Sequence, residues 1–88
     1  MESGKFKLRE NENALKQIRK ALELTQEEFA LILGANRNSV IRWENGQTVP
    51  MFTLPQIKKL QQQLRKLELD FEDIPDDWNV KIKEKVKR

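Results

Sequence analysis

The stretch 24–46 constrains the fold of this 88-residue chain most, because its apolar residues recur with the spacing of amphipathic helices. Thr25 can cap a first helix, and Glu28 three positions later completes a capping box. Gly34 can end that helix, since the residue just past a helix end often needs a positive φ, which glycine adopts without steric cost. We therefore expect a short helix at about 26–33, followed by a tight turn.

A second helix follows this turn directly. Asn36 can cap it and Gly46 can end it, which predicts a helix at about 37–44. Val40 and Trp43 share its inward face, so we expect both side chains to pack in the core. Its outward face carries Arg37, Asn38, Ile41 and Arg42. Two short helices in this arrangement form a helix-turn-helix.

The spacing of these residues resembles that of the Cro/Xre family of bacterial and phage DNA-binding domains, over roughly residues 12–66. The shared positions are Thr25-Gln26-Glu27-Glu28-Phe29-Ala30, Gly34, Trp43-Glu44-Asn45-Gly46 and Pro50. Glu23 departs from the family pattern, because a turn glycine is common at that position. The resemblance implies an all-α fold of the lambda-repressor type, a compact bundle of four to five short helices with a C-terminal extension.

Two further helices flank the motif. Leu15, Ile18 and Leu22 recur at helical spacing and predict a first helix at about 13–23. Thr53 can cap a fourth helix, with a proline tolerated in its first turn. The apolar stripe of that helix continues through Leu64 and Leu67. These two leucines can pack on the C-terminal segment of the same chain or form a seam with a second subunit.

The C-terminal segment allows two readings. Asp76 or Asp77 can cap a final helix, because Trp78, Ile82 and Val86 lie four residues apart. Val80 and Ile82 also alternate with charged residues, so an extended strand is the alternative.

Composition excludes several classes of protein. The chain has no cysteine and no histidine, which removes disulfides, cysteine-ligated zinc and the commonest general base. We expect no catalytic residue, no metal and no cofactor, and therefore no enzyme. The N-terminus lacks the apolar stretch of a signal peptide, and no run of about 18 apolar residues could span a membrane. The expectation is a cytoplasmic protein without a membrane partner.

Charge divides the chain unevenly. Residues 1–60 carry ten basic and seven acidic side chains, residues 61–78 two and six, and residues 79–88 five and one. We expect a basic N-terminal arm at 1–11, a helix-turn-helix DNA-binding domain at 12–67, and an acidic connector with a basic tail at 68–88. This distribution would suit a DNA binder whose acidic stretch faces away from phosphate.

The expected base contacts lie near the start of the second motif helix. By resemblance, Arg37, Asn38 and Arg42 match the positions at which Cro-type domains touch base edges. Arginine can donate two hydrogen bonds to guanine, and asparagine pairs likewise with adenine. Ser39 can reach a base or a phosphate, and a thymine methyl would account for the apolar Ile41.

Phosphate contacts would fix the position of the duplex without reading its sequence. By resemblance, Gln26 grips the DNA backbone from the first turn of its helix. Asn36 and Asn45 flank the reading helix and can donate to phosphates, as can the backbone amides around Gly46 and Gln47. Asn36 can be a helix cap at the same time. The arm residues Lys5, Lys7 and Arg9 can add minor-groove or phosphate contacts.

One ion pair between two helices is also expected. In the family, the glutamate that matches Glu44 pairs with a basic residue on the first helix, and the corresponding residue here is Arg19. A bidentate pair of this kind would join the first and third helices.

The leading hypothesis is a sequence-specific transcriptional regulator that binds double-stranded DNA as a homodimer on a pseudo-palindromic operator. We expect the regulator to repress transcription, because it would occupy a promoter. The alternative is an antitoxin-like interaction module whose segment 68–88 binds a toxin or another protein through Phe71 and Trp78.

Overall fold

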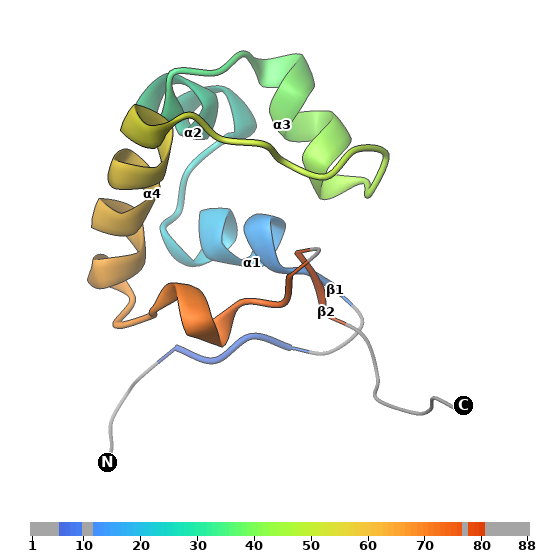
Figure 1. Cartoon of the computed structure of the whole chain (residues 1–88). Coiled ribbons are helices and arrows are strands. Elements are labelled where there is room, and N and C mark those ends of the chain that lie inside the picture. Colours follow the sequence, from blue (N-terminus) through green and yellow to red (C-terminus); the bar gives the residue numbers. More distant parts are fainter. Residues whose placement is uncertain (1–5, 10–11, 77, 81–88) are drawn as a thin grey trace.

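The structure, a computed structural model, describes residues 6–9, 12–76 and 78–80. Its helices are α1 (Ala14–Ala21), α2 (Gln26–Leu33), α3 (Arg37–Glu44) and α4 (Leu54–Lys66), followed by a 3₁₀ turn, η1 (Phe71–Asp73) (Figure 1). Two strands of two residues each, β1 (Glu12–Asn13) and β2 (Asn79–Val80), pair in antiparallel orientation. The expected all-α bundle is confirmed, with this small strand pair in addition.

The ends of the two motif helices follow from local chemistry, as expected. Thr25 forms a reciprocal capping box with Glu28 at the start of α2, and Gly34 ends α2 in the left-handed conformation with φ 72°. Asn36 caps α3 by accepting a hydrogen bond from the backbone N–H of Ser39 at 2.9 Å. These caps satisfy backbone groups that a helix leaves unpaired at its ends.

The core draws on all four helices. Its fully buried large side chains are Leu15, Ile18, Phe29, Leu33, Val40, Leu60 and Leu64. Trp43 is half-buried and packs against this core, with its ring edge-to-face to that of Phe52 at 5.2 Å. Leu64 is 1% exposed, Leu69 is also buried and Leu67 packs against the core, so the C-terminal half of the apolar stripe of α4 packs within its own chain.

The described part of the N-terminal arm lies against the domain. Phe6 and Leu8 are half-buried and pack against the core. The backbone N–H of Arg9 donates to Gln17 Oε1 at 2.6 Å, and Gln17 Nε2 donates back to the Arg9 carbonyl at 2.9 Å. Alternating apolar residues in this segment therefore cover the core beside α1.

The prediction of a final helix is wrong for its first residues, Trp78 to Val80. Trp78 has φ 67°, outside the helical region, and Asn79–Val80 is the extended strand β2. Tertiary pairing determines this conformation, because the N–H of Ala14 donates to the Trp78 carbonyl and β2 pairs with β1. The strand alternative is correct for these two residues, and residues 81–88 lie outside the described part.

Candidate nucleic-acid interface

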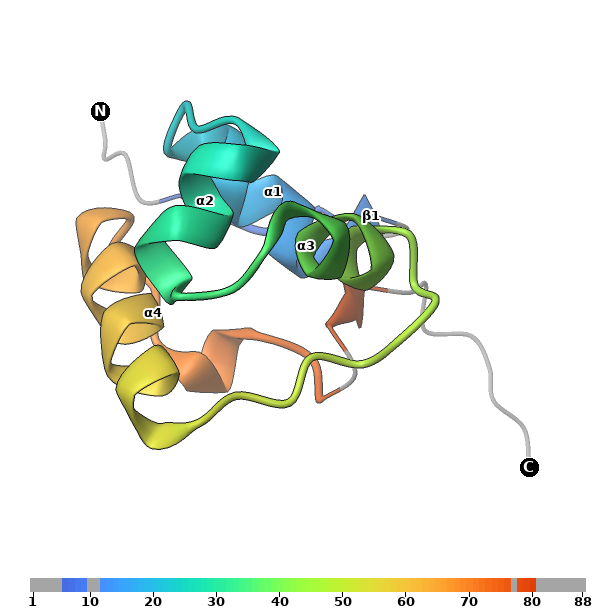
Figure 2. The ribbon, with the colours of Figure 1, turned by 90° about the horizontal axis from the view of Figure 1, so that it is seen from above.

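The turn between α2 and α3 brings the two helices together on one core. Leu33 and Val40, one on each side of the turn, are fully buried in the same core. The N–H of Ala35 donates to the Ala30 carbonyl at 2.9 Å, which closes the end of α2. Seen along α3 in Figure 2, α2 lies directly beside it. Because the side chains of Leu33 and Val40 are both buried, α2 and α3 are anchored to the same core.

The outward face of α3 brings the expected base contacts together. Arg37, Asn38 and Arg42 are exposed, and Ser39 and Ile41 are half-buried, whereas Val40 on the opposite face is fully buried. The first three helical positions thus carry a guanidinium, an amide and a hydroxyl, and a second guanidinium lies just over one turn further along. These groups supply the donors and acceptors that read base edges in a major groove.

The residues expected to contact phosphate lie at both ends of α3 and at the start of α2. Gln26 is half-buried, and its side-chain Nε2 donates to Glu44 Oε1 at 3.1 Å, so α3 orients this amide. The Asn36 cap uses only the carbonyl oxygen of that side chain, which leaves its –NH₂ group outside the cap. Asn45 and Gln47 are both exposed.

The backbone amides of Gly46 and Gln47 already have partners within the chain. The N–H of Gly46 donates to the Trp43 carbonyl at 3.2 Å, and the N–H of Gln47 donates to the Arg42 carbonyl at 2.9 Å. Both amides therefore close the C-terminal end of α3. The side chain of Gln47 is exposed and stays a candidate phosphate contact, together with those of Gln26, Asn36 and Asn45.

The ion pair between α1 and α3 is present. Arg19 Nε donates to Glu44 Oε2 at 2.7 Å and Arg19 Nη2 to Glu44 Oε1 at 3.1 Å, with side chains 11% and 1% exposed. Arg19 Nη1 also donates to the Leu24 carbonyl at 2.8 Å. With the Gln26 contact, Glu44 joins the C-terminal end of α3 to both α1 and the start of α2.

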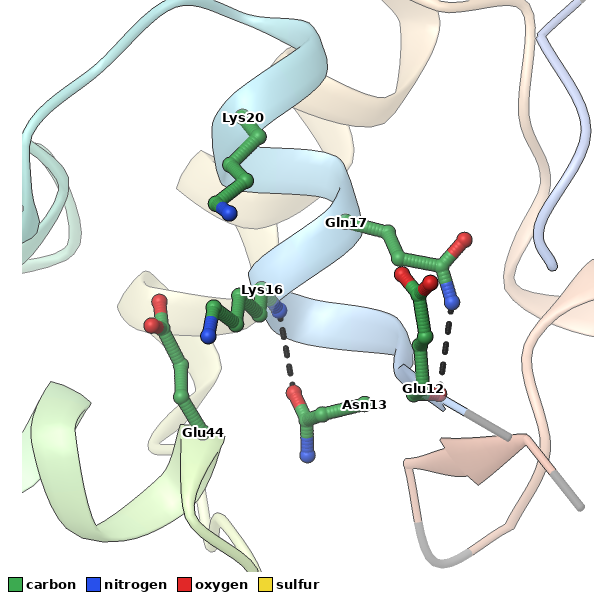
Figure 3. Close-up of a pocket in the computed structure, with 6 residues that line it drawn as sticks. All are labelled: Glu12, Asn13, Lys16, Gln17, Lys20 and Glu44. Atoms are coloured by element: carbon green, nitrogen blue, oxygen red, sulfur yellow. Dashed lines mark hydrogen bonds between the residues drawn. The ribbon is translucent and has the colours of Figure 1, made fainter. Parts of the chain in front are cut away.

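Sequence reasoning missed two lysines next to this network. Lys16 and Lys20 line an open pocket of about 370 Å³ together with Glu12, Asn13, Gln17 and Glu44 (Figure 3). Their spacing of four residues was visible in the sequence, but it gave no sign that this face of α1 lies beside α3. Among the described residues, no group of histidine, cysteine and carboxylate side chains could hold a metal ion.

A family model described as helix-turn-helix matches residues 15–74, from the second residue of α1 to the residue after η1. The chain belongs to this helix-turn-helix family, of the Cro/Xre type. The family comprises DNA-binding transcription regulators and is a non-enzymatic domain type. Comparisons with curated proteins and with solved structures returned no match. In the part of the chain that the structure describes, no helix has the length and apolar character needed to cross a membrane.

Proposed function

We propose that this chain is a sequence-specific repressor that binds an operator in cytoplasmic double-stranded DNA through α3. The observation that carries the proposal is the face of α3. Arg37, Asn38 and Arg42 are exposed together on a helix whose opposite side is locked into the core. Arginine and asparagine are the side chains that form bidentate contacts with guanine and adenine. Repression would follow from occupancy, because a protein on a promoter blocks polymerase.

We further propose that the protein binds as a homodimer. The stretch 45–57 contains no charged residue, and within it Val49, Met51, Leu54 and Ile57 are 53%, 85%, 63% and 37% exposed. A two-fold interface places the same surface against itself, so a charge-free apolar surface avoids the like-charge repulsion that a basic one would create. This surface is a better candidate for the seam than Leu64, which is buried in its own chain.

The experiment that tests the proposal is a genome-wide pull-down of DNA fragments bound by the purified protein. A dimeric Cro-type regulator should recover sites made of two inverted half-sites, about 34–36 Å or one helical turn apart. Recovery of fragments without any shared sequence would contradict sequence-specific binding. A shared single half-site without a repeat would contradict the dimer.

The antitoxin-like alternative makes a different use of the C-terminal segment. Phe71 and Trp78, its candidate partner anchors, are half-buried and pack against the core of the same chain. Trp78 also stacks edge-to-face on Phe52 at 5.9 Å. A partner that used these rings would have to remove them from the core, so the packing supports the regulator over the alternative. A toxin-like protein that co-purifies with the full chain would reverse this preference.

A further inference from the structure

The polar face of α1 carries two positive charges beside the C-terminal end of α3. Lys16 and Lys20 are exposed and line the same open pocket. In Figure 3 both side chains project toward Glu44, and away from Glu12 and Gln17. Within the described part of the chain, neither ammonium group has an ion-pair partner. Two exposed ammonium groups that form no ion pair and project away from the carboxylate of Glu12 favour an anionic ligand.

The negative charge of Glu44 does not neutralise these lysines. Its two oxygens accept hydrogen bonds from Arg19 at 2.7 and 3.1 Å, and one of them also accepts from Gln26 at 3.1 Å. The carboxylate is 1% exposed and is compensated by a guanidinium in direct contact. The α3 side of the pocket therefore presents the two lysine charges to solvent.

The pocket is fixed relative to the reading helix. Asn13 Nδ2 donates to the Trp43 carbonyl at 2.9 Å, which ties the start of α1 to the last turn of α3. Gln26, the expected phosphate contact at the start of α2, is bonded to Glu44, which lines the pocket. A DNA strand that passes the start of α2 would therefore run next to the lysine face of α1.

We propose that Lys16 and Lys20 bind phosphates of this DNA strand and so extend the phosphate-contacting surface from α2 onto α1. This inference rests on the proposed DNA-binding function and adds a site to it. Lysine suits such a site, because its ammonium group is a compact charge on a flexible stem that needs no fixed geometry. Each lysine neutralises one phosphate and releases condensed counterions, but it reads no base.

The test uses the full chain and a fluorescein-labelled duplex of mixed sequence, about 30 base pairs or three helical turns long. Fluorescence anisotropy gives the binding constant over a series of NaCl concentrations for the wild type and for the Lys16→Gln/Lys20→Gln variant. The matched control is Lys59→Gln/Lys66→Gln, which removes two exposed lysines from α4. In Figures 1 and 2, α4 lies on the far side of the molecule from α3. Thermal melts establish that each variant is folded.

The expected result is a shallower dependence of log K on log[NaCl], by about 0.9 per lysine and per bound subunit. The Lys16→Arg/Lys20→Arg variant should keep the wild-type slope, and the α4 control should change it much less. An unchanged slope in Lys16→Gln/Lys20→Gln would overturn the proposal, as would an equal loss in the α4 control, which indicates a long-range charge effect. Failure of the wild type to bind any duplex or genomic fragment would instead overturn the DNA-binding function itself, and the phosphate site with it.

Discussion

Arg19 and Glu44 connect the first and third helices through a bidentate ion pair that is almost fully withdrawn from water. The glutamate is the last residue of the reading helix, and the arginine also holds the carbonyl of Leu24 in the turn before α2. One guanidinium therefore sets the position of α3 against both neighbouring helices.

Breaking this pair should destabilise the domain strongly. Glu44→Gln keeps the shape of the side chain but removes the counter-charge and one of the two acceptors of the buried guanidinium, and loss of one partner costs about 3–5 kcal/mol in comparable buried pairs. Urea denaturation followed by circular dichroism measures the loss. Glu72→Gln, at an exposed position of η1, should change stability by no more than about 0.5 kcal/mol. If the two substitutions cost the same, the pair contributes no more than a surface charge.

The turn between α1 and α2 offers a route to a more stable protein. Glu23 has φ 61°, in the left-handed region where a residue with a Cβ atom is strained and glycine is not. Glu23→Gly should relieve strain of about 1–3 kcal/mol, offset by about 0.4–1 kcal/mol of extra chain entropy in the unfolded state. Its melting temperature should rise, whereas Glu23→Ala, which keeps a Cβ atom, should not. Equal melting temperatures for the two variants would argue against strain.

Arg42 should contribute to the sequence preference of the protein. Arg42→Ala removes a guanidinium from the exposed face of α3, and should lose about 1–3 kcal/mol of discrimination at one base position. Weak binding to random DNA should be largely kept. Competition between operator variants and mixed-sequence duplex separates the two effects. Equal losses on both kinds of DNA would make Arg42 a phosphate contact instead.

Removal of residues 68–88 should expose the core. Leu69 is buried, and Phe71, Ile74 and Trp78 pack against the core from the same segment. The truncated chain should therefore melt at a lower temperature and bind a dye that reports exposed apolar surface. A chain that ends at Val80 keeps Leu69, Phe71, Ile74, Trp78 and strand β2, and should melt at a higher temperature than the chain cut at residue 67. A truncation at residue 67 with unchanged melting temperature would show that the segment is not a cover.

The parts of the fold that could be predicted from sequence are those that depend on near neighbours. Thr25, Gly34 and Asn36 act within four residues of themselves, so the bounds of α2 and α3 followed from local chemistry. The conformation at Trp78 depends instead on Ala14 and β1, which lie far away in the chain. A period of four residues could not reveal that partner, so the helical interpretation was wrong there.

The residues of the candidate site also fall into those that could be predicted from the sequence and those that could not. The outward face of α3 could be identified from helical spacing, because burial of Val40 determines which side chains point away from the core. The position of Lys16 and Lys20 beside α3 could not be identified from the sequence, since it depends on the packing of α1 against the end of α3. The hydrogen bonds of the Gly46 and Gln47 amides back to α3 were not predicted either, although backbone donors just past a helix end commonly bond the last carbonyls of that helix.

The strand pair between β1 and β2 has a consequence for the order in which the molecule assembles. The helix-turn-helix match at 15–74 lies between the two strands, so closing them joins positions near opposite ends of the chain. Such long-range closure is entropically costly until the intervening helices have formed. We expect the strand pair to form last in folding and to open first in the native state, so that the amide of Ala14, bonded to Trp78, exchanges its hydrogen with solvent faster than the amides in the middle of α2.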